Sequence, residues 1–309
     1  MLVRSITTIK LHFPQTTVDD FSIFRPHVQT AEEKYLIPYL GRPTYDRLND
    51  FLDAQPSQPS QPSQPSPEDS LLPIAQRAIV CFAYRVSVPV RNVVDTNTGF
   101  GIVQNSNLVP ASRDRTNALQ EGIEEYGWTA IDVMLQFLED HRSDFPEWYD
   151  SPVSTLAFRN LINNATEFGQ YVKLPEFSRV AFHALRSVMD NVESLIISQK
   201  IGDDLLSDLK TKIKESTLAE EDHKLLEPLK RALANLTLSE NVPDPDRRVS
   251  SPYAIFNITD LARQKYHLVG MEYLNRAIKI QNELSPPSQL SPPSQSWQNL
   301  PTNKIFVAP

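Results

Sequence analysis

Histidine is the commonest metal ligand in proteins, so its positions are a first guide to possible chemistry. The sequence has six histidines, His12, His27, His141, His183, His223 and His267. No two of them are four residues apart, and the single cysteine has no histidine beside it. A helix could therefore not present the paired ligands that a metal ion needs. The sequence predicts no metal site.

Two short patterns resemble parts of catalytic or cofactor sites. The segment TGFGIVQ (residues 98–104) contains Gly-x-Gly but lacks the third glycine and the following helix with which dinucleotide sites hold a pyrophosphate. The segment SDLK (residues 207–210) has the Ser-x-x-Lys spacing of some acyl-enzyme hydrolases, but no KTG element accompanies it. Neither pattern is complete, so we expect no cofactor and no catalytic residue.

Acidic side chains cluster where helices are expected to begin or end. Residues 220–222 are expected to begin and cap a helix, and Asp203 and Asp204 follow a glycine at another helix start, where negative charge meets the positive end of the helix dipole. Glu139 and Asp140 close a long helix, and we expect both to face solvent. None of these groups forms an acid–base pair, so the sequence predicts that the protein is not an enzyme.

The composition is that of a folded protein with an acidic surface. Hydrophobic residues make up 40% and charged residues 22%, and the net charge is −8. Because no run of Lys and Arg marks a nucleic-acid footprint, we expect no sequence-specific nucleic acid partner. The longest apolar run, AIVCFAY (residues 78–84), is far shorter than the roughly 20 residues that cross a bilayer, and the N-terminus lacks a secretory h-region. We expect a cytosolic chain without a membrane helix, in which Cys81 is buried and inert.

Apolar residues recur at helical spacing through most of the chain. The clearest stretches are 35–52, interrupted at Gly41-Arg42-Pro43, and 131–138, 182–192 and 268–278. Only two stretches favour strands: TIKLHF (residues 8–13), and residues 90–104, where β-branched residues flank a Gly-containing turn and predict a β-hairpin. The predicted fold class is mainly α.

Three blocks of the sequence recur in the same order in its second half, which is the signature of an internal repeat. Residues 14–48 match 175–209, residues 71–89 match 225–243, and residues 125–131 match 272–278. The offset falls from 161 to 154 to 147 residues because the first half has longer loops. We infer two tandem homologous helical-bundle domains, the first of which carries the hairpin.

The loops fix the expected domain boundaries. The triplet run at residues 55–67 lies within the first copy, so it is an insertion in a surface loop rather than a hinge. The second copy has a shorter loop at the position that corresponds to this insertion. We expect domain 1 over residues 1–140, a linker with a short helix at about 155–168 over residues 141–170, domain 2 over residues 171–284, and a disordered Pro/Ser/Gln-rich tail over residues 285–309. Trp148, in the linker, is expected to anchor the core.

Apolar residues in the hairpin and the tail are the candidate contact sites. Phe100, Ile102 and Val103 either pack on their own domain or project toward a neighbouring subunit, because an isolated hairpin is marginal alone and its edges can accept further strands. The tail contributes the apolar residues Trp297, Ile305 and Phe306.

Several segments, in order, resemble an uncharacterised family encoded in bacterial genomes and phages. They are AEEKYLIPYLG, LLPIAQRAIVCFAY, GFGIVQ, AIDVMLQFLED, FPEWYDSP and NATEFGQYV. The resemblance covers roughly residues 10 to 284 and rests on the order and spacing of these segments. It implies no catalytic activity.

A looser resemblance concerns the plan of one copy, which is similar to the small helical head–tail connectors of tailed phages. It implies a virion structural protein of the neck region, made in the bacterial cytoplasm, that forms a ring homo-oligomer. Its other partners would be the portal or neighbouring neck and tail proteins. An alternative is a cytosolic adaptor whose Pro-rich tail, with its SPPSQ repeats, binds a partner domain.

Overall fold

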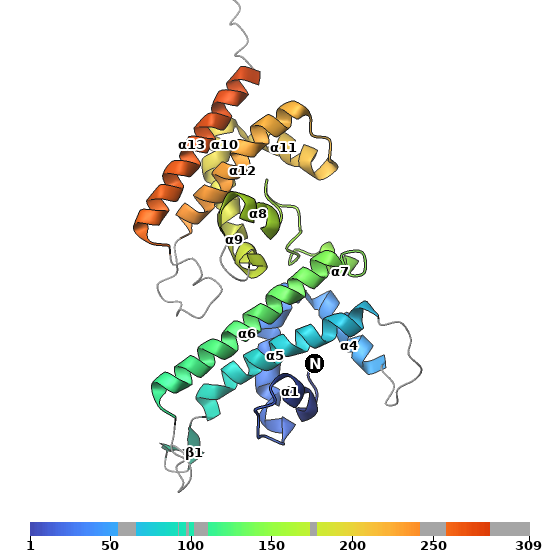
Figure 1. Ribbon diagram of the computed structural model, residues 1–309. Coiled ribbons are helices and arrows are strands. Elements are labelled where there is room, and N and C mark those ends of the chain that lie inside the picture. The colour runs from blue at the N-terminus through green and yellow to red at the C-terminus, as the bar shows by residue number, and fades with distance from the viewer. Residues whose placement is uncertain are drawn as a thin grey trace, which may run out of the picture.

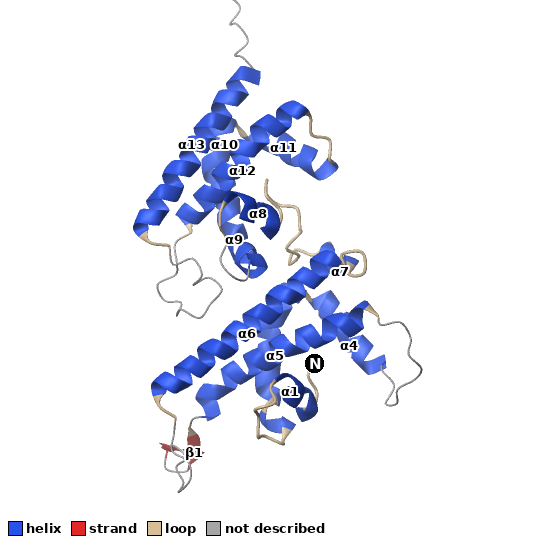
Figure 2. Ribbon diagram, in the orientation of Figure 1, coloured by secondary structure: helices blue, strands red, loops and turns tan. Residues whose placement is uncertain are grey.

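The computed structural model describes residues 1–54, 66–91, 93–96, 99–101, 111–173, 178–241 and 258–284, without the side chains of residues 94–100 and 178. Within these residues the chain is mainly helical, as predicted (Figure 2). The helices form two bodies (Figure 1), which we call the N-terminal lobe (α1–α7) and the C-terminal lobe (α8–α13). Two three-residue strands, β1 (Val94–Thr96) and β2 (Gly99–Gly101), pair antiparallel. The remainder of residues 90–104 beyond α5 lies largely outside the described chain.

The N-terminal lobe is built around α5. Its elements are α1 (Ile6–His12), the 3₁₀-helix η1 (Phe21–Ile23), α2 (Arg25–Ala31), the π-helix η2 (Glu32–Leu36), α3 (Ile37–Leu40), α4 (Arg42–Ala54), α5 (Pro67–Arg91), α6 (Arg113–Asp140) and α7 (Pro146–Tyr149). The Tyr35 and Phe82 rings stack at 4.2 Å, with Trp128 edge-on to both. Helices α5 and α6 approach closely at Gly127, where an added Cβ would lie 2.8 Å from the Phe82 ring.

The C-terminal lobe has its own hydrophobic core. Its elements are α8 (Ala165–Tyr171), α9 (Ser178–Val192), the π-helix η3 (Glu193–Ile197), α10 (Ser198–Ile201), α11 (Asp203–Glu215), α12 (Glu220–Glu240) and α13 (Asp260–Leu284). Helices α12 and α13 pack side by side, and Gly270 lets them approach because an added Cβ would lie 2.7 Å from Leu236. The predicted positions of Asp203, Asp204 and residues 220–222 in the first turns of α11 and α12 are confirmed.

Both lobes break a helix at a glycine with positive φ. Gly41 (φ 76°, ψ 153°) ends α3, and Gly202 (φ 92°, ψ 144°) ends α10. Residues other than glycine rarely adopt this backbone conformation. The sequence pattern Gly41-Arg42-Pro43 predicted the first break, and the structure confirms it.

Two local predictions are wrong. Residues 8–13 form no strand but belong largely to α1, because Ser5 caps this helix by accepting the Thr8 N–H at 3.2 Å and Ile9 faces the core. The helix expected over residues 155–168 forms only at Ala165–Tyr171, where Asn164 caps it and the preceding residues form turns.

Helix α5 is the one helix in the described part of the chain that is long and apolar enough to cross a membrane, with a mean hydropathy of 1.3 over its best window. Length and composition are weak indications here, since 61% of that window is buried inside the molecule and a core helix meets the same criterion.

Candidate interaction surfaces

Among the described residues, no group of three or more His, Cys, Asp or Glu side chains is placed to hold a metal ion. Cys81 is buried, and this burial raises the pKa of its thiol to about 11. The thiol is therefore protonated at neutral pH and a poor nucleophile, as predicted.

The most deeply buried carboxylate of the N-terminal lobe is Glu32, in the first turn of η2. Its Oε1 accepts the Leu2 N–H at 2.6 Å and its Oε2 accepts the Tyr45 hydroxyl at 2.9 Å. Burial raises the pKa of Glu32, while the hydrogen bonds oppose this shift. Both carboxylate oxygens accept hydrogen bonds, so Glu32 holds Leu2 and Tyr45 against the π-helix.

A second deeply buried carboxylate lies in the C-terminal lobe. Glu193 opens the π-helix η3, and its Oε1 accepts the Leu161 N–H at 2.7 Å. Its Oε2 accepts from Asn160 Nδ2 at 3.2 Å and forms an ion pair with Lys210. Each glutamate thus accepts a backbone N–H from the segment that precedes the first helix of its lobe, Leu2 before α1 and Leu161 before α8.

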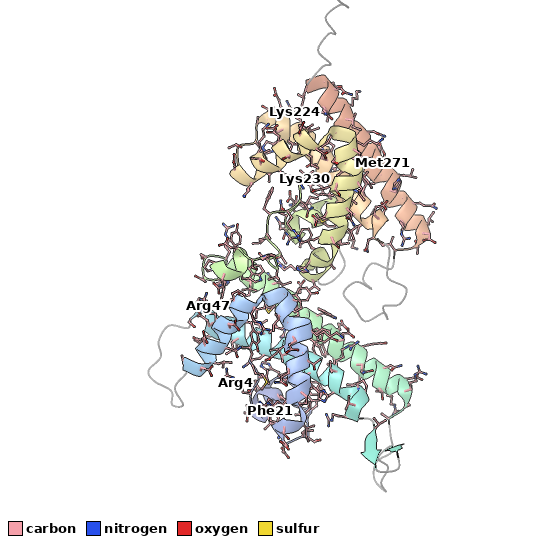
Figure 3. The ribbon with its side chains drawn as sticks, turned by 180° about the vertical axis from the view of Figure 1, so that it is seen from behind. Arg4, Phe21, Arg47, Lys224, Lys230 and Met271 are labelled. Atoms are coloured by element: carbon pink, nitrogen blue, oxygen red, sulfur yellow. The ribbon has the colours of Figure 1, made fainter. Side chains whose placement is uncertain are left out.

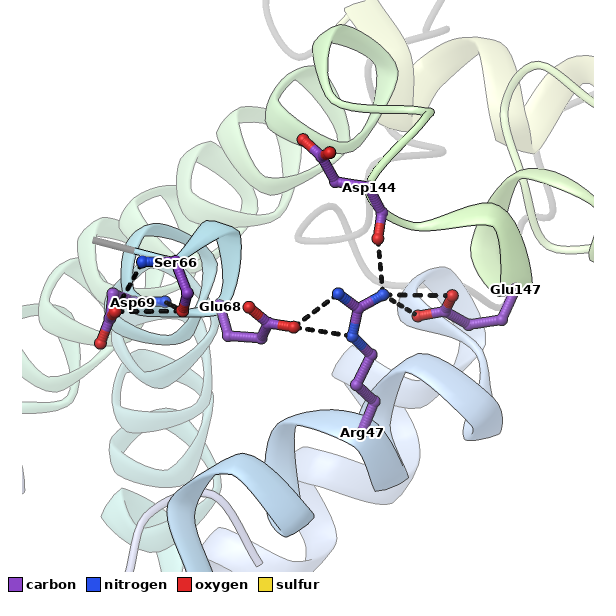
Figure 4. A network of polar contacts seen from close by, with 6 residues as sticks. All are labelled: Arg47, Ser66, Glu68, Asp69, Asp144 and Glu147. Atoms are coloured by element: carbon purple, nitrogen blue, oxygen red, sulfur yellow. Dashed lines mark hydrogen bonds and ion pairs between the residues drawn. The ribbon is translucent and has the colours of Figure 1, made fainter. Parts of the chain in front are cut away.

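Arg47 ties together three elements of the N-terminal lobe (Figure 4). From α4, its guanidinium donates to Glu68 at the start of α5, to the Asp144 carbonyl at 2.6 Å, and to Glu147 in α7 at 3.0 Å. It also lies 4.6 Å from the Phe145 ring centroid. This network positions α7, whose Trp148 is fully buried and donates to the Tyr39 carbonyl at 3.0 Å. Trp148 is a core anchor, as predicted.

The lobes meet where the start of α9 lies against α6 (Figure 1). Asp132 Oδ1 accepts the Arg179 N–H at 2.8 Å and the Val180 N–H at 3.2 Å, so a side chain of one lobe caps a helix of the other. Arg179 Nε donates to Glu139 at 2.7 Å. The prediction that Glu139 faces solvent is wrong, because Arg179 and the Thr155 hydroxyl both bind it; its neighbour Asp140 is exposed.

His183 and Val180 of α9 add to the contact between the lobes, and Arg186 holds the segment between α7 and α8. His183 lies 5.0 Å from the Tyr39 ring, and burial, together with Arg186 and Arg159, lowers the pKa of His183 to about 4. Arg186 is buried and donates to the carbonyls of Ser154, at 2.5 Å, and Ala157. Val180 is fully buried and packs into the N-terminal core. The contact between the lobes therefore combines polar, aromatic and apolar interactions.

An open groove of about 760 Å³ lies between α12 and α13 on the C-terminal lobe. Lys224, which is labelled in Figure 3, is one of its lining residues. Arg231 lies over the rings of Tyr171, at 5.5 Å, and Tyr273, at 5.6 Å. Ile280 and Leu284 supply its apolar wall. Its two acidic lining residues are Glu227 and Glu283, and Glu227 forms an ion pair with Arg231.

A family model matches residues 36–156 and 197–249 of the chain. The chain belongs to DUF6712, a family of unknown function. This confirms the resemblance to an uncharacterised family. No curated protein and no solved structure matches the chain.

The DUF6712 segments include α6 and the Asp132 cap but not α9, which lies between them. The residues that the sequence singled out as contact sites fall elsewhere. Phe100 belongs to β2 without a described side chain, and Ile102, Val103, Trp297, Ile305 and Phe306 lie outside the described residues. Sequence reasoning missed the lobe contact, because nothing in the spacing of Asp132 and Arg179 indicates that they meet.

Proposed function

We propose that this member of DUF6712 is a structural protein of a tailed phage or prophage, a head–tail connector that acts by assembling into a ring. The proposal rests on the absence of a recognisable reactive site among the described residues, on the resemblance in plan to helical connectors, and on the contact between the lobes.

We further propose that the two lobes are copies of one ancestral unit. The same elements follow in the same order: a capped seven-residue helix (α1, α8), a π-helix with a buried glutamate (η2, η3), a four-residue helix ending at a glycine with positive φ (α3, α10), and a 13-residue helix (α4, α11). π-Helices are rare, so their occurrence at matching places favours duplication over chance. The two segments matched by the family model also begin within η2 and η3, 161 residues apart.

One observation supports ring assembly most directly. The contact between the lobes joins unlike faces: α6 of the first lobe receives the start of α9 of the second. When two similar units join through unlike faces, each unit keeps one face free. Further units can therefore add through the same kind of contact, which produces a ring or a filament. A connector requires a ring.

The test is the size and shape of the purified full-length chain. Light scattering is expected to give a discrete oligomer, negative-stain electron microscopy to show closed rings, and mass spectrometry to find the protein in purified virions. A chain that stays monomeric at all accessible concentrations and is absent from virions would overturn the proposal.

A further inference from the structure

We infer that successive copies of the chain join through a second version of the contact that joins the two lobes, with the C-terminal lobe of one copy receiving the N-terminal lobe of the next. This inference rests on the proposed ring function and names its interface. If the lobes are equivalent, the face that α6 uses to hold α9 recurs on the C-terminal lobe. By the offset of 161 residues, the face that α9 presents corresponds to residues 17–24 of the N-terminal lobe, which form an irregular segment followed by η1 instead of a helix start.

The sequence offsets between the lobes identify the residues of these two remaining faces. Asp132 of α6 corresponds to Lys279 of α13, at an offset of 147 residues, and Tyr39 corresponds to Lys200, at an offset of 161. On the partner face, Arg179 and His183 correspond to Val18 and Ser22.

Three of these four positions are exposed in the single chain, whereas the Val18 side chain packs partly against the N-terminal core. Lys200, Lys279 and Ser22 are exposed, Val18 is half-buried, and Val18 is followed by the exposed pair Asp19 and Asp20.

The charges of the two remaining faces are complementary, with signs opposite to those of the lobe contact. Within the chain, the receiving face is acidic (Asp132, Glu139) and the entering face is basic (Arg179). On the remaining faces, the receiving side carries Lys200 and Lys279 and the entering side carries Asp19 and Asp20.

Lys10 already pairs with Asp19, which leaves this entering side with a net negative charge through Asp20. The reversed signs also have a consequence for specificity. An entering face with Asp19 and Asp20 would be repelled by the acidic α6 face of another copy, so it selects the lysine face.

Disulfide trapping tests this assignment in the full-length chain. The buried Cys81 contributes little background, since its thiol is inaccessible. Two pairs probe contact between copies, Val18→Cys with Lys279→Cys and Ser22→Cys with Lys200→Cys. The matched pair within one chain, Asp132→Cys with Arg179→Cys, is the positive control. A disulfide forms only where Cα atoms come within about 7 Å.

We expect the first two pairs to give a ladder of covalent dimers, trimers and larger species on mild oxidation, whereas the control pair gives a cross-linked monomer. A second measurement avoids cysteines: Lys200→Glu with Lys279→Glu should reduce the oligomeric fraction at least tenfold, while Lys224→Glu, in the groove, should leave it unchanged. All three lysines are exposed, so these variants should fold.

The outcomes separate this inference from the proposed function. Rings could form although neither cysteine pair cross-links and although both lysines are replaced by glutamate. This result would overturn the inferred interface but not the proposed ring assembly. A monomeric wild-type chain would overturn the ring itself. Ladders from both cysteine pairs support the interface.

Discussion

Two glutamates illustrate how single residues organise this protein. Glu32 and Glu193 are 3% and 2% exposed, and each accepts a backbone N–H from the residues that begin its lobe. A buried N–H without an acceptor costs free energy, and a carboxylate is a stronger acceptor than a neutral group. Each glutamate therefore holds a chain segment that hydrophobic packing alone would leave less firmly placed.

Replacing either glutamate should destabilise the fold. Glu32→Ala leaves the Leu2 N–H and the Tyr45 hydroxyl without their acceptor, and Glu193→Ala does the same for the Leu161 N–H and removes the partner of Lys210. We expect each variant to lose about 2–4 kcal/mol of unfolding free energy, measured by urea denaturation at neutral pH.

The adjacent residue supplies the control. Glu33 is exposed on the same π-helix, so Glu33→Ala should change the unfolding free energy by less than about 0.5 kcal/mol. Equal losses in Glu32→Ala and Glu33→Ala would show that the buried hydrogen bonds contribute little.

At the scale of the element, each lobe uses a π-helix, a short helix and a glycine to turn the chain. The glycine backbone at Gly41 and Gly202 lies in a region that is strained for any residue with a Cβ. The two sites differ in their surroundings. An added Cβ at Gly41 would lie 3.1 Å from Val153 Cγ2, whereas at Gly202 it would meet nothing within 4 Å.

This difference allows backbone strain to be measured alone. Gly202→Ala should lose about 1–3 kcal/mol of unfolding free energy through backbone strain, and Gly41→Ala should lose more because Val153 must also move. Gly169, inside α8 with open space around it, is the control: Gly169→Ala should be neutral or stabilise by up to about 1 kcal/mol. Thermal and urea denaturation of the three variants checks the order, and a neutral Gly202→Ala would contradict it.

The helices could be predicted from the sequence because apolar periodicity over 8 to 20 residues is a strong signal, and Gly41-Arg42-Pro43 marked a break. Residues 8–13 were predicted as a strand because Thr8, Lys10 and His12 alternate with apolar residues. The segment is helical, and the feature that favours the helix is the Ser5 cap. The π-helices were not foreseeable, because one widened turn hardly changes the periodicity.

The candidate interaction surfaces were harder still. The pairing of Glu139 with Arg179 depends on the placement of whole lobes, which local pattern does not encode.

At the scale of the whole molecule, the contact between the lobes includes a histidine, His183, whose protonation is unfavourable in the folded state. His183 lies against the Tyr39 ring, and its pKa is lowered from 6.5 to about 4, chiefly by burial and further by the positive charges of Arg186 and Arg159. The ring is therefore neutral in the folded state at neutral pH. Protonation of His183 is therefore unfavourable in the folded state.

The sign of the pH dependence follows from linkage. Below pH 6.5 the unfolded chain binds a proton at His183 that the folded chain does not bind until about pH 4, so stability is fully present above pH 6.5 and is lost as the pH falls toward 4. Between pH 7 and pH 5 this single group should cost about 2 kcal/mol of unfolding free energy. Urea denaturation at the two pH values measures the loss.

Two variants isolate this effect from the titration of the many carboxylates. His183→Phe keeps a ring against Tyr39 and removes the titrating group, so it should lose about 2 kcal/mol less than the wild type between pH 7 and pH 5. His183→Asn also removes the ring, so it should start from a lower stability and show the same reduced dependence on pH. If the wild type and both variants lose equal stability on acidification, the proton at His183 does not cause the loss of stability. Because the proposed contact between copies has Ser22 where the lobe contact has His183, acid should loosen the lobes before it separates the copies.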